Sequence, residues 1–137
     1  MKIEIFRLAI DFGLMVLIWM VQLLIYPGFK YFGKDGLSRW HKIYTRNITF
    51  IVAPLMLLQI GLVIYFWLYY HLMFAPNLVY AILVALTWIS TVFIFIPMHA
   101  AIDKNPTEQN LHKLTQYNWL RVILWTAIVI LDFFLIF

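Results

Sequence analysis

Polar side chains that could do chemistry stand near the ends of long apolar stretches. His99 and Asp103 are four residues apart, which places them on one face of a helix, so the carboxylate could orient the imidazole. Asn118 and Arg121 share a face at the start of the last apolar stretch. A histidine base, with an amide and a guanidinium that stabilise an enolate or phenolate oxygen, makes a metal-free acid–base site. We therefore expect four catalytic residues: His99, Asp103, Asn118 and Arg121.

Several other chemistries conflict with the residues present. The chain has no cysteine, which excludes a thiolate nucleophile, Cys-ligated zinc and iron–sulfur clusters. Its six acids are too scattered for a di-iron carboxylate centre, and no acid–histidine–serine spacing suggests a hydrolase. His41 and His99 could supply two axial ligands to haem, so haem stays open as an alternative. The main prediction is a site with no cofactor and no metal.

The composition is that of an integral membrane protein. Of 137 residues, 65% are hydrophobic and 12% are charged, whereas a soluble domain has about 25% charged residues. The mean hydropathy is +0.90. The net charge of +4 concerns membrane orientation in such a chain, so it does not indicate a nucleic-acid partner. We predict one transmembrane domain over residues 1–137.

Prolines, glycines and polar clusters divide the chain into four apolar stretches, each long enough to cross a bilayer. The first is too long for the apolar region of a signal peptide and lacks a cleavage site, so we interpret it as a retained span. Pro54 and Pro97 should kink the second and third helices and leave room for a pocket. The expected fold is an all-α, up-down-up-down four-helix bundle with helices at about 5–26, 47–70, 77–103 and 106–137.

Charge placement predicts the orientation. The connector 29–46 is basic and aromatic, as expected for an amphipathic helix beside anionic lipid headgroups. Asn105 is the expected cap of the last helix. The two connectors hold seven basic residues against one or two on the other side: Lys30, Lys34, Arg39, Lys42, Arg46, Lys104 and Lys113. The positive-inside rule then places connectors 28–46 and 104–115 in the cytoplasm and both termini outside the plasma (inner) membrane.

The same topology gathers polar residues on the cytoplasmic side. Helix ends and starts meet there, so their side chains could line a site for a lipophilic small molecule. A purely structural hydrogen-bond network is the alternative, because snorkelling also collects polar groups at an interface. The expected substrate-binding residues are Gln22, Tyr26, Tyr44, Arg46 and Trp125.

The opposite side gives a weaker signal. Arg7 and Asp11 are four residues apart and could be an interfacial ion pair or a proton or ion site. Gln59 lies mid-span, where an amide usually makes an interhelical hydrogen bond. Aromatic residues mark the membrane surface here, and His71 is expected in a solvated loop. No polar cluster comparable to the cytoplasmic one is predicted on this side.

Short motifs along most of the chain resemble a family of small bacterial four-helix membrane proteins of unassigned function. They are Tyr26-Pro27, Trp40-His41, Arg46, Pro54-Leu55-Met56, Trp88 with Thr91, Pro97-Met98-His99, and Asn118 to Arg121 with Trp125. More distantly, the chain resembles the anthrone-oxygenase-like group, which implies cofactor-independent oxygenation of a phenolic substrate at His99, Asn118 and Arg121. The family pattern has threonine where Val122 stands and an acid where Gln59 stands.

Three classes of function follow. The first is a membrane protein that binds, and as an oxygenase would oxidise, a lipophilic aromatic or isoprenoid-like molecule. The second is a non-catalytic subunit or scaffold, in a homo-oligomer or with a membrane partner. The third is a transporter, which would need charge near the middle of the membrane, where the sequence offers only Gln59.

Overall fold

A computed structural model describes residues 2–70 and 75–137, and helices make up nearly all of them. No strand occurs in those two ranges. The all-helical class is therefore confirmed. His71 and the turn residues 72–74 lie outside the described residues.

The first span continues past the proline at which we expected it to end. It comprises α1 (Lys2–Met20), the π-helical turn η1 (Val21–Ile25), α2 (Tyr26–Gly28) and the 3₁₀ turn η2 (Phe29–Tyr31). Pro27 has no N–H, and its ring would press on the carbonyl four residues earlier. The wider π turn directly before the proline relieves this conflict, so the chain stays helical.

The third span uses the same arrangement. It consists of α4 (Ala75–Ser90), the π-helical turn η3 (Thr91–Phe95) and α5 (Ile96–Lys104). Pro97 again follows directly after the π turn. The predicted disturbance at Pro97 is therefore a local widening of the helix, and the same widening accompanies Pro27 in the first span.

The basic connector and the second span form one helix, α3 (Lys34–Tyr70). At 1.5 Å per residue its 37 residues extend about 55 Å, well beyond the roughly 30 Å of a hydrocarbon core. Pro54 lies within α3 and does not end it. Residues 34–46, expected in a separate segment, thus belong to the same uninterrupted helix as the second span.

The last span is α6 (Glu108–Ile136). Its N-cap is Thr107, whose Oγ1 accepts a hydrogen bond from the Asn110 backbone N–H at 3.2 Å. We expected Asn105 in that role. Instead, Asn105 ends α5 with an extended backbone, which lets the chain turn before the threonine starts the new helix.

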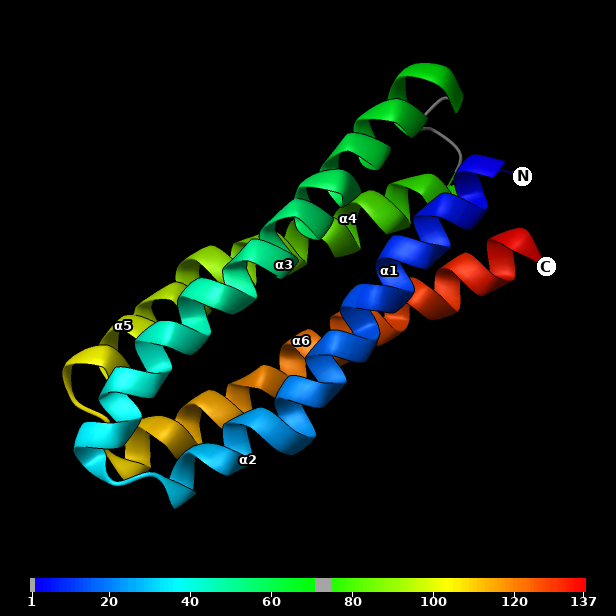
Figure 1. The fold of residues 1–137 in the computed structure, drawn as a ribbon. Helices are drawn as coiled ribbons and strands as arrows, with labels where there is room; N and C mark the ends of the chain where they lie inside the picture. Colours follow the sequence, from blue (N-terminus) through cyan, green and yellow to red (C-terminus); the bar gives the residue numbers. More distant parts are fainter. Residues whose placement is uncertain (1, 71–74) are drawn as a thin grey trace.

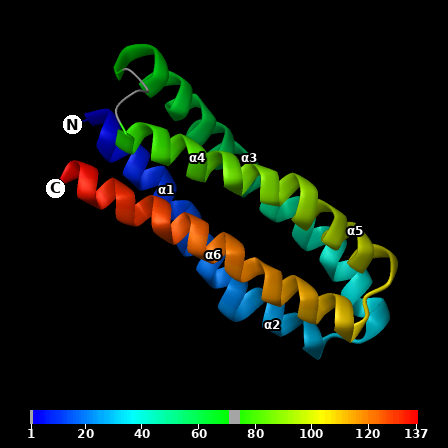
Figure 2. The ribbon, with the colours of Figure 1, turned by 180° about the vertical axis from the view of Figure 1, so that it is seen from behind.

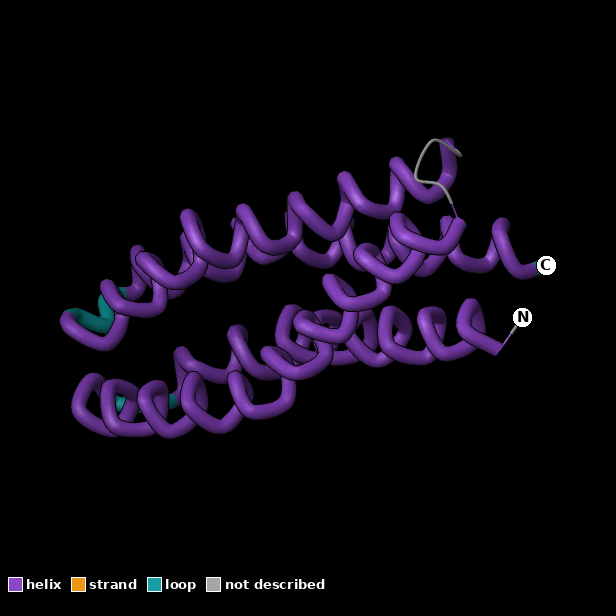
Figure 3. The backbone as a smooth tube through the Cα atoms, turned by 90° about the horizontal axis from the view of Figure 1, so that it is seen from above, coloured by secondary structure: helices purple, strands orange, loops and turns teal. Residues whose placement is uncertain are grey.

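The four helical paths lie side by side (Figures 1 and 2). α6 packs against α1, α4 and α5, and α3 packs against α1, α4 and α5. Both chain termini lie at one end of the bundle, here called the terminus end. The turns between α2 and α3 and between α5 and α6 lie at the other end, here called the connector end (Figure 3).

The outer surface of the bundle is apolar. Large hydrophobic side chains are exposed along every span, among them Leu24, Phe50, Phe93 and Ile123. A water-soluble bundle would place polar residues at such positions. Within the described residues, four helices are long and apolar enough to cross a membrane: 2–31, 34–70, 75–104 and 108–136. The fold is therefore compatible with a multi-pass membrane protein.

Candidate functional site

A chain of hydrogen bonds joins four side chains at the connector end. His41 Nδ1 lies 2.7 Å from Asp103 Oδ1, and His41 Nε2 lies 2.9 Å from His99 Nδ1. His99 Nε2 then lies 3.1 Å from the Tyr26 hydroxyl oxygen. We call Asp103, His41, His99 and Tyr26 the relay.

Three separate elements hold the relay. His41 comes from the early turns of α3, His99 and Asp103 from α5, and Tyr26 from α2. His41 is fully buried, because α3 starts at Lys34 and carries it between the helices. The expectation that Asp103 orients His99 is wrong: the carboxylate bonds His41, and His41 in turn contacts His99.

The carboxylate sets the direction of the relay. An ionised carboxylate can only accept, so His41 Nδ1 donates to Asp103. If His41 is neutral, its Nε2 accepts from His99 Nδ1–H, and His99 Nε2 accepts from the Tyr26 hydroxyl. This assignment satisfies each ring nitrogen without a charge on either imidazole. Each donor then points from Tyr26 towards Asp103, whose side chain is 31% exposed.

Arg121 is a buried cation beside the relay, and within the described part of the chain no buried carboxylate pairs with it. Its guanidinium carbon lies 4.5 Å from the centre of the Phe95 ring and 5.2 Å from that of Trp125. It also interacts electrostatically with the hydroxyl groups of Tyr26 and Tyr44. Its Nε is buried and has no hydrogen-bond partner among the described residues. Aromatic faces and phenol oxygens thus hold a positive charge that an anion would stabilise.

One turn earlier on α6, Asn118 joins a second hydrogen-bond group. Asn118 Nδ2 donates to Gln22 Oε1 at 2.9 Å, and Gln22 Nε2 donates to the Thr115 carbonyl at 3.2 Å. Both amides are buried. The side-chain carbonyl oxygen of Asn118, Oδ1, has no hydrogen-bond partner among the described residues. This pair ties α6 to the π-helical turn η1, where the widened backbone carries Gln22.

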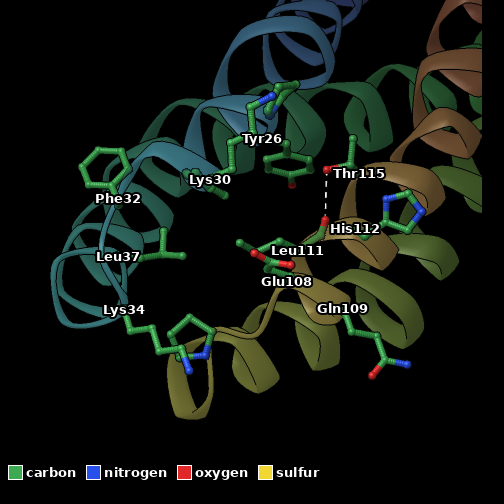
Figure 4. A pocket seen from close by; sticks show the side chains of 13 residues that line it. Tyr26, Lys30, Phe32, Lys34, Leu37, Glu108, Gln109, Leu111, His112 and Thr115 are labelled. Atoms are coloured by element: carbon green, nitrogen blue, oxygen red, sulfur yellow. Dashed lines mark hydrogen bonds between the residues drawn. The ribbon is translucent and has the colours of Figure 1, made fainter.

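A cleft of about 650 Å³ opens next to Tyr26 at the connector end. It lies between η2, the start of α3 and the start of α6 (Figure 4). Its lining combines apolar, aromatic and basic side chains: Tyr26, Pro27, Phe29, Lys30, Phe32, Lys34, Leu37, Pro106, Glu108, Gln109, Leu111, His112 and Thr115. Tyr26 is the residue that belongs to both the cleft and the relay.

The remaining predicted site residues fall into two groups. Tyr44 is buried and packs edge-on against Tyr26, with ring centres 6.5 Å apart. Trp125 is buried beneath Arg121. Arg46 is exposed and borders a separate groove on the outer face of α3 with Thr45, Thr49 and Phe50. The structure therefore brings Tyr44 to Tyr26 of the relay and Trp125 to Arg121 beside it, and it leaves Arg46 outside.

The histidine pair bears on the haem alternative. His41 and His99 are roughly stacked, with ring centres 5.0 Å apart and an interplanar angle of 28°. A haem iron between two imidazoles needs both ring nitrogens about 2 Å from the metal, on opposite sides of it. The 2.9 Å between the nitrogens is a hydrogen-bond distance, so haem binding would require the rings to separate.

A second buried cluster, which the sequence reasoning missed, lies at the terminus end. Arg7 Nε lies 2.8 Å from Asp132 Oδ1. Asp11 accepts hydrogen bonds from Gln59 Nε2 and, at 3.1 Å, from the Tyr80 hydroxyl. The expected interfacial Arg7–Asp11 pair is thus wrong, and so is the prediction that this side lacks a comparable polar cluster. Because neighbouring helices run antiparallel, these five residues lie at similar depths in the bundle. Their positions within the predicted spans could therefore have indicated the cluster.

Comparison with known proteins adds no relative to this picture. No protein-family model, curated protein or solved structure matches the chain. The resemblance to small four-helix membrane proteins and to the anthrone-oxygenase-like group stays a prediction.

Proposed function

We propose that this membrane protein binds a lipophilic small molecule in the connector-end cleft and exchanges protons with it through an acid–base site. The observation that carries the proposal is the continuous relay from half-exposed Asp103 to Tyr26, which also lines the cleft. A purely structural hydrogen-bond network would not need to reach a ligand-sized cleft at one end and a partly exposed carboxylate at the other. A chain that runs from the surface to a ligand-sized cleft suits proton exchange with a bound molecule.

The proton can move through the relay by two linked transfers. Tyr26 gives its hydroxyl proton to His99 Nε2, while His99 gives its Nδ1 proton to His41 Nε2. The products are a tyrosinate and a His41 imidazolium beside the Asp103 carboxylate. The tyrosinate can then accept a proton from the ligand, and the reverse sequence returns one.

Arg121 supports this role electrostatically. The tyrosinate carries a negative charge in an apolar interior, where an isolated ion is strongly disfavoured. Arg121 supplies a fixed positive charge that interacts with Tyr26 and Tyr44 and is otherwise held by aromatic rings. Preorganised charge of this kind stabilises an anion that forms during a reaction.

The cleft lining supports a class of ligand. Leu37, Leu111 and Phe32 favour a hydrocarbon or aromatic body, and Lys30 and Lys34 favour an acidic oxygen. We therefore propose a phenolic or similarly weakly acidic lipophilic ligand. Oxidation of the deprotonated ligand by dioxygen would be a later step, and it stays a prediction.

We infer that the bundle crosses the plasma membrane with the connector end in the cytoplasm and both termini outside. Seven Lys and Arg residues in the connectors support this orientation. In this orientation, the first turns of α3 lie at the cytoplasmic surface. Exposed Arg39, Trp40 and Lys42 there suit contact with anionic headgroups.

The test uses 1-naphthol as a probe, because its neutral and deprotonated forms absorb at different wavelengths. The full chain in lipid nanodiscs should bind 1-naphthol and increase its deprotonated fraction. Tyr26→Phe should keep binding and lose the increase. Tyr31→Phe is the matched control, because Tyr31 is a neighbouring tyrosine that is 82% exposed and lies outside the relay.

Other outcomes would redirect the assignment. An unchanged deprotonated fraction in Tyr26→Phe would contradict the role of the relay. No binding by the wild type, with co-purification of another membrane protein, would favour the non-catalytic subunit. A Soret band in the purified protein that disappears in His41→Ala and in His99→Ala would replace the cofactor-free site with haem.

A further inference from the structure

The terminus-end cluster consists of Arg7, Asp11, Gln59, Tyr80 and Asp132. Each is at most 1% exposed, and together they come from α1, α3, α4 and α6. The relay and the cleft lie at the opposite end of the bundle. The cluster is therefore a separate feature that the proposed acid–base site does not use.

The charges of the cluster do not balance if both acids are ionised. Two carboxyl groups face one guanidinium, which leaves a net charge of −1 in a buried setting. Uncompensated buried charge is strongly unfavourable, and a carboxyl group usually takes up a proton to avoid it. Glu4 on α1, a further acid, also interacts with Arg7. The surroundings thus call for one more positive charge.

Hydrogen-bond geometry shows where that charge belongs. Gln59 and Tyr80 each donate to one oxygen of Asp11, whereas Arg7 Nε forms an ion pair with Asp132 Oδ1 at 2.8 Å. Both carboxyl oxygens of Asp132 are buried, and neither has a hydrogen-bond donor among the described residues. The Asp11 and Asp132 carboxyl groups also interact electrostatically with each other and with Arg7. Two carboxyl groups can share a hydrogen bond only if one of them carries a proton.

We infer that Asp11 and Asp132 form a proton-binding site that holds one exchangeable proton between α1 and α6. The proton makes the cluster neutral and supplies the missing donor for Asp132 Oδ2. Arg7 packs over the rings of Phe66 and Tyr80 at 4.7 and 4.6 Å, which keeps water from the pair. Arg7 also disfavours sodium as the bound cation, because two fixed positive charges would then lie side by side.

The site is near enough to the membrane surface to exchange its proton with the terminus side. Arg7 lies in the second turn of α1, about 8 Å along the helix from Lys2. Asp132 lies one turn before the end of α6 at Ile136. Raising the pH on that side removes the proton and leaves a negative charge inside the bundle, so stability falls as the pH rises.

Infrared spectroscopy of the full chain in detergent tests the site directly. A protonated carboxyl group gives a C=O band that shifts in D₂O and disappears on ionisation. The wild type should show this band at neutral pH and lose it as the pH rises. Asp11→Asn and Asp132→Asn should each abolish it, because the remaining carboxylate then pairs with Arg7. Asp103→Asn and Asp35→Asn should keep it.

Melting temperatures give a second, independent readout. Each single Asn variant should melt no lower than the wild type, whereas the double variant should melt far lower, because Arg7 then loses both buried carboxyl groups of the cluster. The proposal is overturned if the band is absent from the wild type or survives in both single variants. It is also overturned if each single variant melts as low as the double one. Sodium-dependent melting without the band would identify a sodium site instead.

Discussion

The two ends of this bundle bury polar groups in different ways. At the terminus end, an arginine and two aspartates meet directly, and charge holds α1 to α6. At the connector end, the Asp103 carboxylate and three neutral groups form the relay, and Arg121 rests on aromatic rings with no buried carboxylate of the described residues beside it. Removal of the arginine should therefore disturb the first cluster strongly, whereas removal of Arg121 should disturb the second weakly. The residues of the first cluster are all buried, whereas the second cluster reaches both a cleft and a partly exposed carboxylate.

An apolar layer separates the clusters. Leu14, Ile18, Val84 and Ile128 are all buried between them. Thr87 on α4 donates its hydroxyl to the carbonyl of Val84 in its own helix, so it does not bridge the layer. The two clusters can therefore be altered independently, because mutations that far apart without shared partners usually add.

The largest expected effect is at Arg7. Arg7→Met removes the cation and leaves two buried carboxyl groups, so we expect a loss of about 3–5 kcal/mol in unfolding free energy. Denaturation in mixed detergent micelles measures it. Arg46→Met, an exposed control on α3, should change stability by less than about 0.5 kcal/mol. If Arg7→Met were as stable as the wild type, charge pairing would not stabilise the terminus end.

An intermediate effect is expected within the relay. His41→Phe leaves His99 Nδ1 without its partner but frees a carboxylate that can reach water, so the loss should be about 1–3 kcal/mol. The increase in deprotonated 1-naphthol should disappear as well. His112→Phe is the control, because His112 lines the cleft outside the relay. If both variants behaved alike, the relay would have no special role.

A smaller effect should mark the layer between the clusters. Trp19 Nε1 donates to Thr126 Oγ1 at 3.2 Å and links α1 to α6 outside both clusters. Trp19→Phe should lower the unfolding free energy by about 1 kcal/mol, as for one neutral hydrogen bond. The same denaturation assay measures this change. A much larger loss of unfolding free energy would mean that this hydrogen bond, and not apolar packing alone, holds the layer together.

The smallest stability effect is expected at Arg121, and it sharpens the contrast with Arg7. Arg121→Met removes a cation without leaving a buried carboxylate unpaired, so unfolding free energy should change by less than about 1 kcal/mol. Affinity for deprotonated 1-naphthol should nevertheless fall, by roughly tenfold for each 1.4 kcal/mol of lost attraction. A loss of stability as large as that of Arg7→Met would show that both ends depend on charge in the same way.

Composition and spacing were enough to predict the class of fold. Four apolar stretches of spanning length become four long helices, because in lipid a helix satisfies its own backbone groups. The sequence also indicated His99, Asn118 and Arg121, since polar groups in an apolar run must find partners. The continuation of the helix through Pro27 was not predictable, because the π turn depends on packing as much as on the proline.

Which residues meet was decided by tertiary structure. Local spacing predicted Arg7 with Asp11 and His99 with Asp103, each at four residues along one helix. The fold pairs Arg7 with Asp132 and His41 with Asp103 instead. Side chains on one helix compete with those that neighbouring helices bring to the same depth, and a buried group takes the partner with the better geometry. Sequence therefore determined that these groups need partners, and the packing of antiparallel helices decided which partners they have.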